Sequence, residues 1–422
     1  MTSGSPLSKY PQTLRGPASA RAAARLIALL CAAQLLSMVG VFAFPALLPA
    51  FLVEWGLTNT QAGWISGAYF GGYTAAVPVL ASLTDRVDAR RVYLAGALVA
   101  ALASAGFALG ARGFWTALIL RALAGLGLAG TFIPGLKALV DRIEPRFQPR
   151  AVALYTASFG LGTSLSFYAA GELGGIFGWR WAFGAAAWGA LAALALAGAV
   201  LRPRAPLPGP RLRLLDFGPV VRNRESLAYI LAYASHTWEL FALRSWAVAF
   251  LTFSAGLWTG DVSWSPATVA AVGGIAATAA NVGGGELAAR FGNRRVLTGL
   301  MLGSAGLGAG IGFAAGLPYP AVALLLIAYN LLVQADSSAL HMGTVASAPP
   351  DRRGTTMALQ SLAGFGTASL GPLAVGMVLD ATGGGNTSAS WGAAFLTMAA
   401  AVALGPLFLR RARHTQDRPG IP

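Results

Sequence analysis

The sequence predicts an all-α membrane protein with twelve transmembrane helices in two pseudo-symmetric six-helix halves. Three observations support this fold class: an apolar composition, uncharged stretches that recur along the chain, and basic residues confined to one side. The chain has 422 residues, of which 56% are hydrophobic and 11% charged, whereas a soluble domain carries about 25% charged residues. The composition therefore predicts an integral membrane protein.

The uncharged stretches are long enough to cross a bilayer, whose core takes about 20 apolar residues per helix. They are 26–53, 55–84, 92–111, 151–171, 181–201, 262–285, 354–379 and 381–409. The stretch 296–335 holds two more spans, divided by the "GLPYP" of 316–320. Two segments interrupted by charges, one around Arg121 and one at 226–252, complete the predicted twelve.

The basic residues predict the orientation. When the spans are numbered in order, the 30 Lys and Arg residues lie in the tails or after even-numbered spans, except Arg112, Arg121, Arg180 and Arg244. Basic loops remain in the cytoplasm, so we expect a multi-pass protein of the cytoplasmic (inner) membrane with both termini cytoplasmic. The net charge of +15 is therefore explained by membrane topology, and no nucleic-acid partner is predicted.

The domain organisation follows from these segments. We predict a cytoplasmic tail at 1–24, a six-helix half at 25–201, a linker rich in proline and arginine at 202–225, a second half at 226–409, and a tail at 410–422. Two patterns recur at the same offset between the halves: Arg90-Arg91-Val92 as Arg294-Arg295-Val296, and Gly160-x-Gly162-Thr163 as Gly364-x-Gly366-Thr367. Such repetition favours a duplicated six-helix unit, as in secondary transporters.

Two loops carry a resemblance to a known family. "ASLTDRVDARR" at 81–91 and "GELAARFGNRR" at 285–295 resemble the signature loop of the major facilitator superfamily. Asp85 and Arg86 match its acidic and basic pair, and Arg90 and Arg91 match its final basic pair. The departures are Ala81 and Asp88 in place of two glycines, and Ala289 in place of the second acid.

The resemblance implies a conformational latch. In that family the loop acid lies near the amino end of a helix in the other half, where the helix dipole and free N–H groups stabilise a carboxylate. We expect Asp85, with Arg86, Arg90 and Arg91, to form this latch. The alternative is that the loop arginines only enforce topology, which is the interpretation we favour for the second copy.

Arg121 begins "RALAGLGLA", which resembles the family's fourth-helix pattern. It lies about 10 Å along a helix that enters at residue 114. Two interpretations remain open: the guanidinium faces the translocation path, or it extends to the outer interface.

The seventh span contains "HTWELFALR" at 236–244, and the resemblance implies that this helix lines the central cavity with the first, fourth and tenth. His236 and Glu239 are three residues apart and share a helix face. They lie about 15 and 20 Å from the cytoplasmic end, near the middle of the bilayer core. Charged groups at that depth are costly and mark a solute or proton route. Arg244 lies about 80° from His236 around the helix.

The tenth span supplies Asn330, Gln334 and Asp336. Asp336 lies about 13 Å from the cytoplasmic end, close to the depth of His236. A carboxylate in a low-dielectric cavity is favoured in its protonated form, so Glu239 or Asp336 is expected to load and release a proton. A purely structural ion pair between the two helices is the alternative.

The sequence thus predicts a secondary active transporter that moves a small polar or anionic solute by alternating access, coupled to protons. An uncoupled facilitator of the same fold, or a non-transporting sensor or scaffold, are the alternatives. No catalytic arrangement or metal-ligand spacing occurs, so neither an enzyme nor a cofactor is expected. Solute, protons and lipid are the expected partners of a monomer. The predicted pathway residues are His236, Glu239, Arg244, Asn330, Gln334, Asp336 and Arg121.

Overall fold

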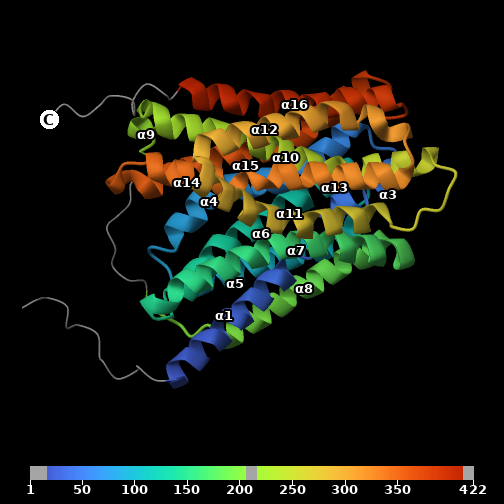
Figure 1. Cartoon of the computed structure of the whole chain (residues 1–422). Helices are drawn as coiled ribbons and strands as arrows, with labels where there is room; N and C mark the ends of the chain where they lie inside the picture. Colours follow the sequence, from blue (N-terminus) through green and yellow to red (C-terminus); the bar gives the residue numbers. More distant parts are fainter. Residues whose placement is uncertain (1–16, 206–215, 412–422) are drawn as a thin grey trace, which may run out of the picture.

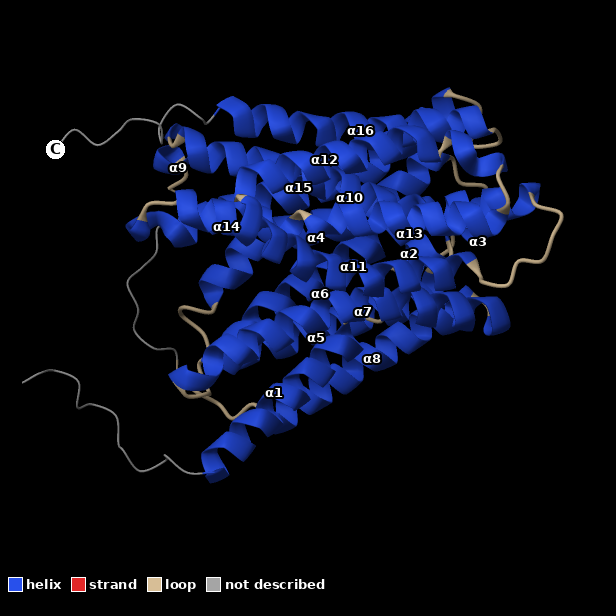
Figure 2. Cartoon of the chain, in the orientation of Figure 1, coloured by secondary structure: helices blue, strands red, loops and turns tan. Residues whose placement is uncertain are grey.

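The computed structural model describes residues 17–205 and 216–411, and within these ranges the regular structure is helical (Figures 1 and 2). The first half comprises α1 (Pro17–Ser37), α2 (Ala43–Ala46), α3 (Leu48–Glu54), α4 (Asn59–Leu83), α5 (Ala89–Gly110), α6 (Phe114–Val140), α7 (Gln148–Phe177) and α8 (Trp179–Val200). The second comprises α9 (Gly218–Arg222), α10 (Arg224–Leu257), α11 (Pro266–Phe291), α12 (Asn293–Ile311), α13 (Tyr319–Ala335), α14 (Ser337–Ser347), α15 (Arg353–Ala381) and α16 (Ser388–Arg411). Three 3-10 turns are η1 (Pro145–Phe147), η2 (Phe313–Gly316) and η3 (Pro350–Arg352).

The all-α membrane class is confirmed. Within the described ranges, 9 helical segments are long and apolar enough to cross a membrane. The other long helices, α4, α7 and α12, have 25, 30 and 19 residues and are not among these nine segments. All three are rich in glycine, which adds little hydropathy but allows helices to pack closely. With these three, the helix order follows that of the predicted spans.

The two halves meet along two helix pairs, α4 with α15 and α7 with α11. Figure 1 shows α1, α5, α7 and α8 on one side of the molecule and α12, α14 and α16 on the other. Glycines bring α4 against α15, because a Cβ at Gly63 or Gly67 would collide with the backbone of Pro372 or Ser369. The pair is therefore in direct backbone contact over the first half of α4.

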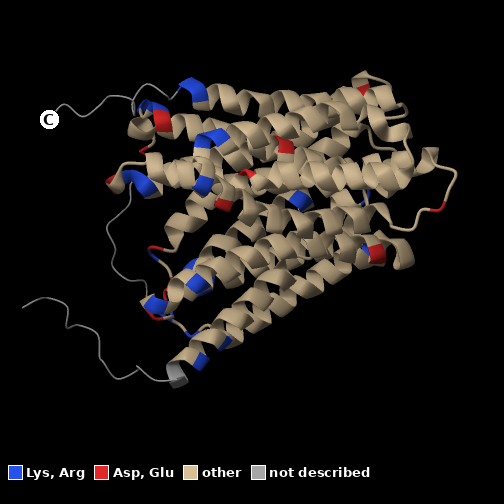
Figure 3. Cartoon of the chain, viewed as in Figure 1, with Lys and Arg blue, Asp and Glu red and all other residues tan. Residues whose placement is uncertain are grey.

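The two ends of the bundle differ in charge. We call the end with α9 and residues 202–205 the linker end, and the opposite end, with Asn59 and the 258–265 loop, the far end. Figure 3 shows that most Lys and Arg residues lie at the linker end. Residues 206–215 of the predicted linker, and most of the predicted tails, lie outside the described residues. Helix α1 begins at Pro17 and α10 at Arg224, so both begin before the predicted span boundaries.

Two of the predicted spans are broken helices. The first is interrupted between α1 and α2, and the tenth at Asp336, between α13 and α14. Side chains satisfy the freed backbone groups: Arg121 donates to the carbonyls of Gly40 at 2.8 Å and Val41 at 2.6 Å, and Asn281 accepts from the Ser338 N–H at 2.8 Å. Irregular backbone is tolerated at membrane depth where protein buries it or a cavity adjoins it.

Candidate solute and proton site

The site is centred on the break in the tenth span. Asp336 lies between α13 and α14, and its Oδ1 is 2.7 Å from Nδ1 of His236 on α10. Both residues are about 1% exposed. Protein therefore surrounds this contact, and the charges of the pair depend on where its proton resides.

Glu239 lies one turn further along α10 and is 0% exposed. It accepts hydrogen bonds from the Tyr329 hydroxyl at 2.8 Å and from Ser304 Oγ at 3.3 Å. The carboxyl thus faces α12 and α13 inside the second half. Neither His236 nor Arg244 forms an ion pair with it in the described structure.

Further titratable groups lie near the His236–Asp336 pair, on α10 and α14. The Tyr233 ring lies 5.8 Å from the His236 ring and 4.9 Å from the His341 ring, between centroids. Nδ1 of His341 is 2.9 Å from the Ser337 carbonyl. These side chains form a cluster of titratable groups around the His236–Asp336 pair, in which His341 is only partly buried.

Arg244 lies on the side of the second half that faces the first. Its Nη2 donates to Oε1 of Gln334 at 3.2 Å, and its guanidinium carbon lies 5.7 and 5.9 Å from the ring centroids of Phe42 and Phe241. Within the described ranges it has no ion pair. The side chain is only partly buried, and it borders a cavity of about 20 Å³ that Asn330 also lines.

Arg121 lies apart from these residues, inside the first half, and is 2% exposed. Its guanidinium carbon is 4.3 Å from the Tyr69 ring centroid, in addition to its two bonds to backbone carbonyls. The guanidinium is therefore held at the break between α1 and α2. Its described contacts are all with residues of the first half, and both interpretations of its role stay predictions.

The predicted latch residues lie at the linker end. Asp85 and Arg86 are exposed, as is Arg91, and the Asp85 side chain makes no hydrogen bond or ion pair with described residues. Arg90 donates to the Gly198 carbonyl at 3.1 Å. This bond joins the first turn of α5 to α8, and Asp85 has no latch contact in this conformation.

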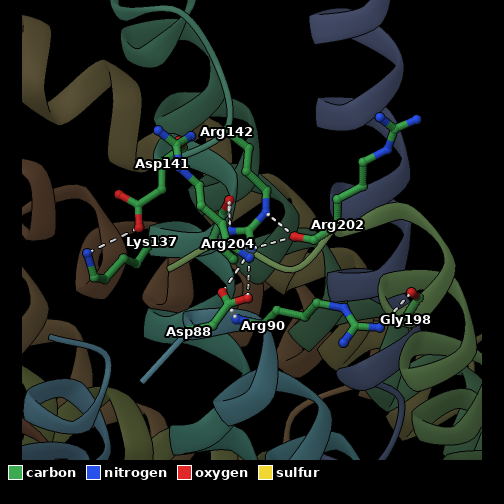
Figure 4. A network of polar contacts seen from close by, with 9 residues as sticks. Asp88, Arg90, Lys137, Asp141, Arg142, Gly198, Arg202 and Arg204 are labelled. Atoms are coloured by element: carbon green, nitrogen blue, oxygen red, sulfur yellow. Dashed lines mark hydrogen bonds and ion pairs between the residues drawn. The ribbon is translucent and has the colours of Figure 1, made fainter. Parts of the chain in front are cut away.

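Asp88, which replaces a family glycine, is the centre of a polar network (Figure 4). It caps α5 through the Arg90 N–H, pairs with Arg142 at 2.8 Å and accepts from the Arg204 N–H at 2.8 Å. Burial alone would raise the pKa of the Asp88 carboxyl, but these hydrogen bonds from Arg142 and the two backbone N–H groups hold it below its ordinary value. The network ties the start of the linker to the first half.

Sequence analysis missed Asp380, near the end of α15. Its Oδ1 accepts from the Asn59 N–H at 3.0 Å and the Asn59 amide at 2.9 Å. Its Oδ2 accepts from the Thr60 N–H at 2.8 Å and from Thr60 Oγ1 at 2.6 Å. A carboxylate of the second half thus caps α4 at the far end. The available signal was an acid at the end of an apolar stretch, opposite the polar run Thr58-Asn59-Thr60.

This fold and its buried polar site define a helical membrane transporter. The sequence model of the Major Facilitator Superfamily matches residues 30–335, well over half of the chain. The chain belongs to that family, and the resemblance of its loops is confirmed.

Curated relatives are similar over part of their length. The "Probable sphingolipid transporter spinster homolog 1" of Arabidopsis thaliana is 29% identical over 31% of this chain and 26% of its own. "Protein spinster homolog 1" of Homo sapiens is 27% identical over 56% of this chain and 44% of its own. The "Niacin transporter NiaP" of Acinetobacter baylyi is 27% identical over 34% of this chain and 32% of its own. The matches thus span less than half of each relative.

Solved structures show the same fold. A bacterial homolog of the human lysosomal transporter Spinster, described as inward-facing and unoccupied, has a TM-score of 0.72 at 17% identity, covering 93% of this chain and 95% of the other. The POT family transporter PepTSo has a TM-score of 0.74 at 14% identity, covering 93% and 99%. At these identities the likeness concerns the fold alone.

Proposed function

We propose that the chain is a secondary active transporter that couples proton movement to the transport of a small polar or anionic solute. The observation that carries this proposal is the His236–Asp336 contact at a helix break, 2.7 Å long and almost fully buried. A proton that joins or leaves this pair changes the charge of a site enclosed by protein. Such a change favours one packing of the two halves over another, which is how coupling arises.

Alternating access is supported by the unequal ends of the bundle. At the far end the halves are in backbone contact, with Asp380 capping α4 across them. Toward the linker end a cavity of about 250 Å³ separates α4 and α6 from α15. We propose that the basic linker end is cytoplasmic, in a cytoplasmic membrane, so that this conformation opens inward and a monomer completes the cycle.

The test is solute-dependent proton movement in proteoliposomes that contain a pH-sensitive dye. A solute library is first screened by thermal shift, and each stabilising solute is then added outside. An internal pH change that depends on both the protein and the solute supports coupling. Solute exchange without a pH change favours the uncoupled facilitator, and the absence of any flux favours a sensor or scaffold.

A further inference from the structure

Two arginines lie inside the described bundle without an ion pair, and their surroundings differ. Both terminal nitrogens of Arg121 are satisfied by backbone carbonyls. Arg244 has one hydrogen bond, to the neutral amide of Gln334. A cation at membrane depth without a counter-charge is costly, so an anion that reaches Arg244 gains from both its charge and its free N–H donors.

We propose that Arg244 binds the carboxylate of an amphipathic organic acid, with Asn330 as a second polar contact. This inference rests on the proposed transport function and names the class of its solute. A single cation matches a monoanion. A dianion requires a second positive group, which the described residues around Arg244 do not provide.

Asn330 is the independent observation. It is 8% exposed. Its Oδ1 has no hydrogen-bond partner among the described residues, and its side-chain N–H groups donate to none of them either. These N–H groups are the ones from which a carboxylate can accept. A buried amide without a partner is destabilising, and a carboxylate that accepts from its N–H groups removes part of that cost. Asn330 lines the same cavity of about 20 Å³ as Arg244, and a space of roughly 10–15 Å³ admits one water-sized group.

Both halves contribute to this cavity. Arg244 and Asn330 belong to α10 and α13 of the second half, whereas Thr163 and Ser164 belong to α7 of the first. A solute bound here therefore contacts both halves. A site at the interface of the two repeats is what a rocking mechanism requires.

Aromatic rings indicate an apolar body for the solute. Phe42 and Phe241 flank the guanidinium, and Phe241 packs 4.3 Å from Phe70, between ring centroids. Toward the linker end, the ring centroids of Tyr73 and Phe365 are 4.5 Å apart, and both rings line the 250 Å³ cavity. A solute that moves from this cavity to Arg244 passes these rings. A strongly hydrated ion loses solvation there, whereas an apolar group gains contact.

The test is calorimetric titration of the purified full-length protein in detergent, with benzoate as the probe. Benzamide keeps the ring and removes the charge; acetate and inorganic phosphate keep a charge and remove the ring. We expect benzoate to bind at least tenfold more tightly than each of the three. Arg244→Gln should lose at least tenfold in benzoate affinity, Arg244→Lys and Asn330→Ala should lose less, and Arg112→Gln, which removes an exposed charge, should bind as wild type.

Three results would overturn the inference: benzamide binding as tightly as benzoate, acetate or phosphate doing so, or no benzoate binding. Unchanged benzoate affinity in Arg244→Gln would overturn the assignment of the site. If that variant does not fold, Arg244→Lys and Asn330→Ala replace it. Unchanged benzoate affinity in both would likewise overturn the assignment of the site. The titration involves no proton gradient and therefore does not test proton coupling. If the protein moves protons with another solute but does not bind benzoate, only this inference is wrong.

Discussion

Thr60, in the first turn of α4, donates two hydrogen bonds to Asp380 near the end of α15, from its N–H at 2.8 Å and its Oγ1 at 2.6 Å. The two helices are antiparallel and belong to different halves. Each therefore presents its amino end beside the other's carboxyl end, where a carboxylate is stabilised by free N–H groups. Asp380 occupies that position at the far end, and Asp85, just after α4, has the corresponding place in sequence at the linker end.

This relationship predicts opposite effects of the two acids on the conformational equilibrium. Asp380→Ala removes the acceptors that hold the far end closed, and a loss of about 1.4 kcal/mol shifts the equilibrium tenfold. In a Cys31→Ser background, a Ser369→Cys reporter between α4 and α15 should then react faster with an impermeant maleimide. Asp85→Asn should slow the same reaction, because the far end stays closed longer.

The control for this pair is Asp261→Ala, which removes an exposed acid of the far-end loop and should leave the reaction rate unchanged. If Asp380→Ala also leaves it unchanged, the capping contact does not hold the far end closed. If Asp85→Asn accelerates it, the two acids do not act as opposed latches.

The fold could be predicted from the sequence, since span length and basic loops are local patterns set by the bilayer. The breaks in the first and tenth spans could not. The segment from Met38 to Phe42 is apolar, and its departure from helix depends on Arg121, about 80 residues away, which bonds the carbonyls of Gly40 and Val41. Such a long-range bond has no signal in local hydropathy.

The site could be predicted in part. Depth along each helix placed His236 and Asp336 at similar levels, and the structure brings them into contact. The surroundings of Glu239 could not be predicted, because its donors Tyr329 and Ser304 look like ordinary residues of apolar helices. Asp380 was missed because the family pattern draws attention to the linker end.

A substitution of Arg121 can distinguish a structural role of this residue from a role in the translocation pathway. Arg121→Lys keeps the charge but replaces a planar fork, which serves two carbonyls, with a single ammonium. We expect unfolding to become easier by roughly 3 kcal/mol, from hydrogen bonds to a charged group of about 1.5–3 kcal/mol each. Scanning fluorimetry of the purified variant measures this change. A variant with wild-type thermal stability but no solute flux would instead place Arg121 in the pathway.

The Asp88 network predicts a pH-dependent contribution to stability. The pKa of Asp88 in the folded state lies below its ordinary value, so its contribution is present above that value and is lost as pH falls through the lowered pKa. Asp88→Asn should lower the free energy of unfolding at pH 7 by about 1–2 kcal/mol, measured as a lower melting temperature. The difference from wild type should shrink as the pH approaches 3. A difference that stays constant with pH would show that the carboxylate charge is not responsible.

The orientation of the bundle can be tested with single cysteines in the Cys31→Ser background. Pro210→Cys lies in the predicted cytoplasmic linker, and Asp261→Cys lies in the far-end loop. Because basic segments remain in the cytoplasm, position 210 should react with an impermeant reagent only after the cells are opened, whereas position 261 should react in intact cells. Reaction of position 210 in intact cells would contradict the proposed topology.

The last prediction concerns the buried carboxyls, Asp336 and Glu239. Asp336→Asn and Glu239→Gln keep shape and hydrogen bonding but remove titration, so a coupling acid loses its function while a structural one is largely replaced. Asp336 contacts a titratable histidine at 2.7 Å, whereas Glu239 is held by two neutral hydroxyls. We therefore expect Asp336→Asn to abolish uptake driven by a pH gradient while retaining solute exchange.

Glu239→Gln should reduce gradient-driven uptake less, because the glutamine oxygen can still accept from Tyr329 and its NH2 group can donate to the Ser304 hydroxyl. Both variants are measured in proteoliposomes with and without an imposed pH gradient, and exchange at equal pH serves as the control for folding. If both still concentrate solute in response to the gradient, neither acid is the coupling site. The uncoupled facilitator, or coupling to another ion, then becomes the better account of the buried pair, and the contact between His236 and Asp336 serves to join α10 to the broken tenth span.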